Sequence, residues 1–188
     1  MDVSMIKNEL RCEYLAKRKA IPAEVRADKD RALCRLLSES DLFLNAKEIL
    51  AYAPKSPEID ILPLVQKAIE LGKRVAFPRC AQDFSLSFHY AHPSQLVRGH
   101  FGIMEPSDNL PLCQASEDSI CLVPALLFDF EGYRIGYGKG YYDRFLSSYR
   151  GLAVGIARDA FILPKLPRGA FDLRVKVLAS ETEVKALS

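Results

Sequence analysis

The fold of this chain is decided by Val123-Pro-Ala-Leu-Leu-Phe-Asp129 and by the segment that soon follows, Gly132-Tyr-Arg-Ile-Gly-Tyr-Gly-Lys-Gly-Tyr-Tyr-Asp-Arg144. The first part is an apolar run that suits a buried strand. The second part is a glycine-rich turn that opens an amphipathic helix, predicted over Tyr141–Tyr149. A strand, a glycine loop and a helix in this order predict a phosphate site. Glycine lets backbone N–H groups surround an anion, and a helix N-terminus favours negative charge.

Neither of the two common phosphate loops matches this segment. The P-loop pattern needs Ser or Thr after its lysine, but Lys139 is followed by Gly140. The dinucleotide pattern G-x-G-x-x-G fails because Tyr141 stands where its third glycine belongs. Glycines that serve only tight turns remain an alternative, although the interleaved Arg134, Lys139 and tyrosines favour a site for an anion.

Composition and charge exclude several classes of protein. The hydrophobic content of 49% in 188 residues is enough for one substantial core, so we expect a single domain over residues 1–188. The net charge is only +2 and no basic block occurs, which argues against nucleic acid and membrane partners. We expect a monomer whose partners are small molecules.

The cysteines and the N-terminal residues indicate the compartment. Five cysteines form an odd set without C-x-x-C spacing, so neither a disulfide framework nor a zinc site is indicated. Lys7, Glu9, Arg11 and Glu13 occupy the region where a signal peptide would need an apolar core. We therefore expect a cytoplasmic protein with reduced thiols.

Hydrophobic periodicity predicts helices first and then an alternation of strands and helices. Helices are expected over Ser4–Lys19, from Pro22 to Leu37, and from a cap at Asp60 to Gly72. Strands are expected over Glu48–Ala53, Arg74–Phe77 (stopped by Pro78), Phe84–Tyr90 (at an edge or antiparallel), Ser119–Val123, Leu152–Ala157 and Val175–Ala179. This order predicts an α/β fold in three layers, α/β/α, with a mostly parallel central sheet preceded by N-terminal helices.

Four stretches of the chain together resemble the 5-formyltetrahydrofolate cyclo-ligase family, also called 5,10-methenyltetrahydrofolate synthetases. Val123 to Arg144 resembles the family's signature segment. The other three correspond in order and spacing to the family patterns K-x-x-L-R, E-[IV]-D and G-x-F-G-I-x-E-P: Lys7-Asn-Glu-Leu-Arg11, Glu58-Ile-Asp60 and Gly99-His-Phe-Gly-Ile-Met-Glu-Pro106. The resemblance covers nearly the whole chain. It implies a fold like that of sugar-phosphate isomerases and CoA transferases.

The resemblance also implies a reaction, in which 5-formyltetrahydrofolate is cyclised to 5,10-methenyltetrahydrofolate while ATP becomes ADP and phosphate. The formyl oxygen must leave as N10 closes the ring, and phosphorylation turns it into a good leaving group. Positioning and positive charge should supply most of the catalysis, because this chemistry needs no general base and no covalent nucleophile. ATP is the expected co-substrate and Mg²⁺ the expected cofactor.

Site residues follow from the resemblance by position. Those implied for catalysis are Arg134, Lys139 and Tyr142. Those implied for ATP are Lys7, Arg11, Arg134, Gly136, Gly138, Lys139, Gly140, Tyr141 and Tyr142. Those implied for the folate are Ala53, Glu58, Tyr137, Gly138, Lys139, Gly140 and Tyr141, with Glu58 accepting hydrogen bonds from the pterin ring. Asp143 and Asp172 are implied as Mg²⁺ ligands.

Around Asp172 the chain departs from the family pattern, which often has His before this aspartate and a further Asp after it. Phe171 and Lys176 stand there instead. Two other functions stay open at this point. One is a sugar-phosphate isomerase or CoA-transferase-like enzyme that uses the glycine loop for a phosphate ester, and the other is a noncatalytic folate- or nucleotide-binding protein.

Overall fold

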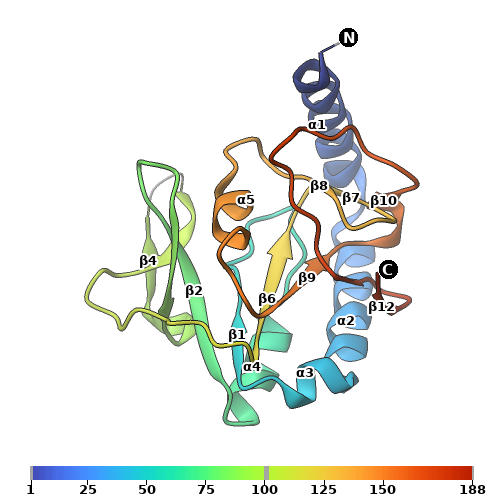
Figure 1. Ribbon diagram of the computed structural model, residues 1–188. Helices are drawn as coiled ribbons and strands as arrows, with labels where there is room; N and C mark the ends of the chain where they lie inside the picture. Colours follow the sequence, from blue (N-terminus) through green and yellow to red (C-terminus); the bar gives the residue numbers. More distant parts are fainter. Residues whose placement is uncertain (1, 100–101, 188) are drawn as a thin grey trace.

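The computed structural model describes residues 2–99 and 102–187, and Figure 1 shows helices on both sides of a central sheet. His100 and Phe101 of the family-like motif lie outside the described residues. The helices are α1 (Val3–Ala20), α2 (Ala23–Glu39), α3 (Asp41–Asn45), α4 (Leu62–Glu70) and α5 (Tyr141–Leu146). Among the described residues, no helix is both long and apolar enough to cross a membrane.

The central sheet has seven strands in the order β12-β11-β9-β6-β1-β2-β3. In chain order these are β1 (Glu48–Leu50), β2 (Arg74–Cys80), β3 (Leu86–Tyr90), β6 (Ser119–Pro124), β9 (Leu152–Ile156), β11 (Val177–Ala179) and β12 (Val184–Ala186). The five inner strands pair in parallel, while β3 and β12 run antiparallel at the edges. The predicted α/β fold with a mostly parallel sheet is confirmed.

The alternation of side chains along the strands builds a core on each face of the sheet. Ile49 and Ile120 belong to the cluster that packs with α2 and α4. Their neighbours Leu50 and Cys121 point the other way, into the cluster beneath α5. Both faces of the sheet are thus covered, as parallel strands require, and the layer order is α/β/α.

Two smaller sheets flank the main one. The first consists of β10 (Ile162–Leu163), β7 (Leu127–Asp129) and β8 (Arg134–Ile135), and the second of β4 (Leu96–Arg98) and β5 (Met104–Pro106). Short 3₁₀ helices lie at Pro93–Gln95 and Asp159–Phe161. The fully buried Asp129 accepts backbone N–H bonds from Glu131, Tyr133 and Leu166, and so holds the turn between β7 and β8.

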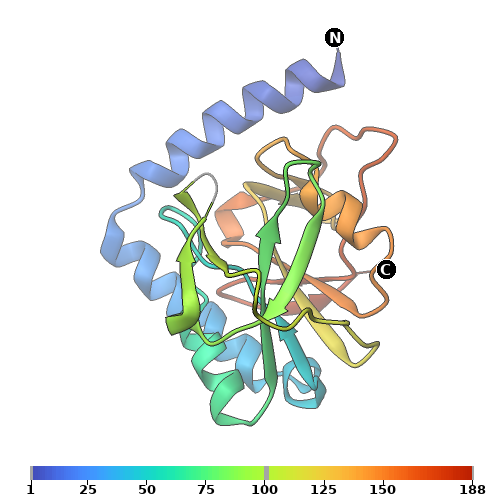
Figure 2. The same cartoon turned by 90° about the vertical axis from the view of Figure 1, so that its left-hand side faces the viewer.

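The N-terminal helices form as predicted, and a proline separates them. Asp2 caps α1 by accepting from the N–H of Ser4, at 3.1 Å. The helix ends at Ala20 because Pro22 disfavours helical geometry in Ile21. Figure 2 shows α1 crossing one end of the molecule before α2 turns down along it. Leu10 and Tyr14 pack α1 against the small sheet of β7 and β8.

Several predicted boundaries were wrong. Strand β2 continues through Pro78 to Cys80. The backbone nitrogen of Pro78 faces the β1 side of the strand, beyond the last residue of β1 that pairs with β2, so no N–H donor is required there. The run Val123–Asp129 divides between β6 and β7, which belong to different sheets. Strand β3 begins at Leu86 rather than Phe84, helix α5 ends at Leu146 rather than Tyr149, and the cap of α4 is Ile61 rather than Asp60.

Candidate active site

The glycine loop runs from the end of β8 to the start of α5. Two of its positions require glycine, since Gly138 has φ of 92° and Gly140 has φ of 70°. Gly140 is also the residue that precedes the first turn of α5. A β-carbon added at Gly138 would lie 3.3 Å from the guanidinium carbon of Arg11. Any other residue at this position would therefore have a strained backbone and would crowd Arg11.

Helix α1 brings its two predicted cations to this loop. Arg11 donates from Nε to the carbonyl of Gly136 at 2.9 Å. Lys7, one turn earlier on the same helix face, forms an ion pair with Asp172, and both of these side chains are mostly buried. Residues separated by more than a hundred positions in sequence therefore meet at one place.

Arg134 lies beneath the loop and organises it. Its side chain is 4% exposed and donates from Nη2 to Oδ1 of Asp143 at 2.6 Å. Its Nη1 donates to the carbonyl of Leu173 at 2.7 Å, while the N–H of Leu173 donates to the same Asp143 oxygen at 3.2 Å. Burial lowers the pKa of Arg134, and Asp143 opposes that shift. Arg134 thus fastens α5 to the segment that carries Asp172.

The other loop residues present one mobile cation and two aromatic rings. Lys139 is exposed and forms no ion pair with the described residues, and its Nζ lies 5.8 Å from the ring centre of Phe84. The hydroxyl of Tyr141 donates to the carbonyl of Ala81 at 3.2 Å. The hydroxyl of Tyr142 is buried without a partner in the described part of the chain, and burial raises its pKa well above the usual value.

Phe84 is a neighbour of this site that the sequence did not indicate. It sits in the turn between β2 and β3 with φ of 64°, which is unusual for a residue with a side chain. Its ring centre lies 5.9 Å from that of Tyr141 and 5.6 Å from Cζ of Arg144. The alternation of apolar residues led us to place Phe84 in a strand, whereas the turn aims it at the glycine loop.

A narrow crevice at the carboxyl ends of the central strands adjoins this loop. It is lined by Arg18, Tyr52, Glu58, Ile59, Pro124, Ala125 and Ile156. These residues lie at or beyond the ends of β1, β6 and β9, apart from Arg18 on α1. The chain winds outward in opposite directions from β1 and β6, so the crevice lies at the switch point where open α/β sheets bind ligands.

Glu58 places a carboxylate in the crevice. Its Oε2 accepts from the N–H of Lys55 at 2.9 Å. Burial raises the pKa of Glu58, while that hydrogen bond, the nearby hydroxyl of Tyr137 and the charge of Arg18 lower it. Tyr137 thereby connects the glycine loop to the crevice. Ala53 is half-buried against the core and does not line the crevice.

Asp143 and Asp172 fit a magnesium site that has only two protein carboxylates and takes its other ligands from the nucleotide and from water. The hydrogen bonds of Asp143 fall on Oδ1 and those of Asp172 on Oδ2, so within the described residues each carboxylate keeps one oxygen for a metal. Mg²⁺ commonly takes one or two carboxylates together with waters and phosphate oxygens. The described residues contain no cluster of three or more His, Cys, Asp or Glu that could hold a metal without a nucleotide.

Sequence reasoning missed Arg18, because Lys17 and Lys19 beside it suggest an ordinary exposed face. Arg18 is 2% exposed and lines the crevice together with Glu58.

The expected reduced thiols are free cysteines in the structure, at Cys12, Cys34, Cys80, Cys113 and Cys121.

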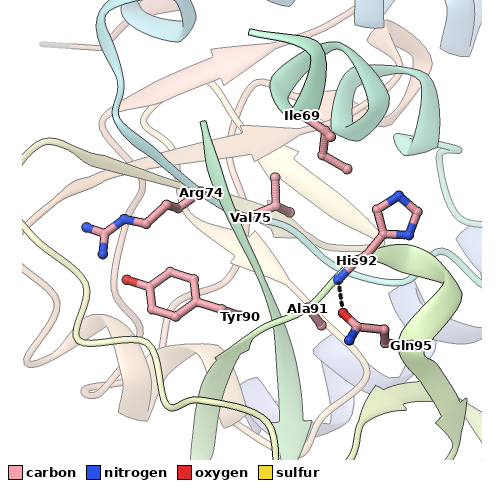
Figure 3. Close-up of a pocket in the computed structure, with 7 residues that line it drawn as sticks. All are labelled: Ile69, Arg74, Val75, Tyr90, Ala91, His92 and Gln95. Carbon is pink, nitrogen blue, oxygen red and sulfur yellow. Dashed lines mark hydrogen bonds between the residues drawn. The ribbon is translucent and has the colours of Figure 1, made fainter. Parts of the chain in front are cut away.

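A larger hollow of about 330 Å³ lies elsewhere, between the start of β2, the end of β3 and α4 (Figure 3). Figure 3 shows Arg74, Tyr90 and His92 on its walls. It is wide open, and none of the predicted site residues lines it. The Tyr90 hydroxyl and Arg74 both engage the buried Glu48, which makes this a structural cluster at the amino end of the sheet.

The known proteins that are similar to this chain belong to one family. The sequence model of the 5-formyltetrahydrofolate cyclo-ligase family matches residues 3–181. A 5-formyltetrahydrofolate cyclo-ligase of Mycolicibacterium smegmatis is 32% identical over 96% of this chain and 97% of its own length. The cyclo-ligase of Escherichia coli is 30% identical over 89% of this chain and 96% of its own length.

Two solved structures extend the comparison to the fold. The 5,10-methenyltetrahydrofolate synthetase of Aquifex aeolicus superposes with a TM-score of 0.85 at 35% identity, covering 97% of this chain and 93% of that one. The synthetase of Mycoplasma pneumoniae gives a TM-score of 0.76 at 21% identity, covering 93% and 98%, and supports the fold alone. These similarities favour the first of the three functions that the sequence left open.

Proposed function

Because the chain belongs to the 5-formyltetrahydrofolate cyclo-ligase family, we propose that its glycine loop holds ATP against a folate bound in the adjoining crevice. The enzyme is a 5-formyltetrahydrofolate cyclo-ligase, of a family that depends on ATP. The observation that carries the proposal is the hydrogen bond from Arg11 to Gly136, which joins the N-terminal cations to the loop. The roles of individual residues below are part of this proposal.

In the proposed reaction, the formyl oxygen attacks the γ-phosphorus and ADP leaves. N10 then attacks the activated formyl carbon and loses its proton, and the carbon–oxygen bond breaks to release phosphate. Each step moves negative charge through the loop region, so fixed positive charge stabilises the transition state more than the ground state. Arg134 and Lys7 are held by ion pairs in fixed places, and Arg11 is held by the loop carbonyl.

Lys139 supplies the cation that follows the transferred phosphoryl group. It is exposed, stands between two glycines with positive φ, and has no ion pair in the described ranges, so its ammonium is available to a ligand. Gly138 and Gly140 let the loop backbone approach the phosphates, and Tyr141 and Tyr142 flank the nucleotide. Tyr142 bears a buried hydroxyl that a phosphate oxygen could accept from.

Glu58 orients the folate by accepting from the pterin N3–H and 2-amino groups. Tyr137 covers the pterin from the glycine loop, and Ala53 bounds the approach to the crevice. The carboxylate must be ionised to accept both bonds. As the pH falls, Glu58 becomes protonated and folate binding is lost. Because the pKa of Glu58 is raised, this loss occurs at a higher pH than for an ordinary glutamate.

Asp143 and Asp172 would hold Mg²⁺ through their free oxygens when the nucleotide is bound. The metal would supply charge neutralisation of the phosphates. The chain's own part is to hold the two carboxylates in place, which Arg134 and Lys7 do through their ion pairs. We further propose that the 188 residues form one domain that acts as a cytoplasmic monomer.

The test follows the near-ultraviolet absorbance of the methenyl product when protein, 5-formyltetrahydrofolate and Mg-ATP are mixed. Lys139→Ala should lower kcat/KM by about 30- to 1,000-fold, which is the loss of about 2–4 kcal/mol of transition-state stabilisation from a preorganised charge. Lys185→Ala, which removes an exposed lysine on the edge strand β12, is the matched control. Equal turnover in both variants would show that Lys139 of the loop takes no part in the reaction.

A further inference from the structure

The crevice holds a second charged group beside Glu58, and no role has been assigned to it. Arg18 reaches the crevice from α1, and only 2% of it is exposed. A buried guanidinium at the switch point of the sheet is costly unless its donors are satisfied. Its partners therefore bear on what the crevice binds.

Part of the guanidinium is fixed by the protein itself. Nη2 donates to the carbonyl of Ala125 at 2.5 Å and to that of Leu126 at 3.0 Å. Cζ lies 5.0 Å from the ring centre of Phe161. The planar fork is thus held from one end and from one face, so its remaining N–H groups point in fixed directions.

The Nε–H of Arg18 is one of the donors that remain. It is buried and has no hydrogen-bond partner among residues 2–99 and 102–187. In the unliganded protein the crevice is closed even to a water molecule, so a trapped water does not serve this donor, and the side chains around the crevice must move apart before a pterin can enter. An oriented, unsatisfied donor in a ligand crevice indicates a missing acceptor that the ligand brings.

The pterin ring carries such an acceptor next to the groups that Glu58 takes. Along one edge it presents the 2-amino group and N3–H, both donors, and then the carbonyl oxygen O4, an acceptor. Glu58 accepts from the two donors and leaves O4 in need of a donor.

We infer that Arg18 is a specificity-determining residue for the folate, whose Nε–H donates to O4 of the pterin beside the carboxylate of Glu58. This inference rests on the proposed placement of the pterin in the crevice. Arg18 and Glu58 together match the donor, donor, acceptor sequence of the pterin edge. The hydroxyl of Tyr137 lies near Glu58 in the free protein, so Tyr137 has to move aside for the pterin to reach them.

A purely structural role for Arg18 makes a different prediction. In that case Arg18 only anchors α1 to the chain beyond β6, through the carbonyls of Ala125 and Leu126. Its loss would then weaken all folates equally. A donor to O4 instead discriminates between a 4-oxo and a 4-amino pterin, because the amino group does not accept from Nε–H.

The experiment compares the binding of 5-formyltetrahydrofolate with that of its 4-amino-4-deoxy analogue, by calorimetry on the full chain. Arg18→Lys is the main variant, because its ammonium keeps the charge and donors for the two carbonyls but has no Nε–H. Arg18→Met serves as a second variant, and Lys17→Met, at the exposed neighbouring position, is the control. The preference for the 4-oxo ligand should fall about 10- to 100-fold in both Arg18 variants. The KM for ATP should not change.

Three outcomes separate the hypotheses. An unchanged preference in Arg18→Lys and Arg18→Met, with both ligands weakened equally, overturns the inference. Glu58→Gln tests the premise, because folate binding that survives this change places the pterin elsewhere and refutes the proposed site itself. A direct readout on the unmodified protein is the Nε–H resonance of Arg18, which should shift on addition of 5-formyltetrahydrofolate and stay in place with ATP alone. If this resonance does not shift when 5-formyltetrahydrofolate is added, the inference is also overturned.

Discussion

Replacing Arg134 with methionine should damage both the stability and the chemistry of the enzyme. The guanidinium is 4% exposed, and it neutralises Asp143 at 2.6 Å while donating to the carbonyl of Leu173 at 2.7 Å. Methionine fills a similar space but offers neither the charge nor the donors. The variant thus leaves a carboxylate without its cation and a backbone carbonyl without its donor.

The magnitude follows from these two losses. Breaking a fully buried ion pair costs about 3–5 kcal/mol, but Asp143 is 31% exposed and rehydrates in part, so about 1–2 kcal/mol applies here. The orphaned carbonyl of Leu173 adds about 1 kcal/mol. The free energy of unfolding should fall by about 2–3 kcal/mol. Removing the charge from the nucleotide site should cost about 2–4 kcal/mol of transition-state stabilisation in addition.

Urea unfolding measures the first quantity, and initial rates of methenyl formation well below the unfolding midpoint measure the second. Arg150→Met, at an exposed position after α5, is the control and should change stability by less than about 0.5 kcal/mol. Loss of stability with normal turnover would show that Arg134 is only a structural anchor. Unchanged stability would refute the reasoning about the Asp143 pair.

Three further predictions concern other parts of the molecule. The pKa of Glu58 is raised in the folded state, so the folded protein binds the Glu58 proton more tightly than the unfolded protein does. The ionised carboxylate therefore lowers the stability of the fold, and this effect is fully present above the folded-state pKa. Glu58→Gln should therefore raise the unfolding temperature at pH 7 relative to wild type while abolishing tight folate binding, and a lowered unfolding temperature would contradict this. Gly138→Ala, at φ of 92°, should cost about 1–2 kcal/mol in stability and raise the KM for ATP by displacing Arg11. Gly72→Ala, at a similar φ of 72° but with nothing within 4 Å of the added carbon, is the control: it should lose stability without changing the KM for ATP, and an equal rise of this KM in both variants would refute the argument. Asp30→Ala breaks the two buried 2.8 Å bonds to Arg158 and should destabilise the fold by about 3–5 kcal/mol, measured by denaturant unfolding, with KM values unaltered. A loss below about 1 kcal/mol would contradict it.

Local sequence patterns predicted the elements well where a pattern is complete within the element. The two N-terminal helices carry their periodicity, a capping Asp2 and a separating Pro22 within the segment itself. Boundaries were wrong where a neighbour decides them. Pro78 stays in β2 because β1 has already ended beside it, and Phe84 leaves β3 because the chain turns there. Such facts depend on residues distant in the chain.

The sequence by itself determined the fold class and the family, and it predicted the chemistry of the glycine loop, because side-chain periodicity and motif spacing are local properties. It also named Lys7, Arg11, Arg134, Asp143 and Asp172, which the structure brings into one cluster. Only the tertiary structure decided that Arg18 is buried beside Glu58, and that a crevice opens where the chain leaves β1 and β6 in opposite directions. Burial and hydrogen-bond satisfaction are properties of packed neighbours. An arginine between two lysines therefore shows its role only after the chain has folded around it.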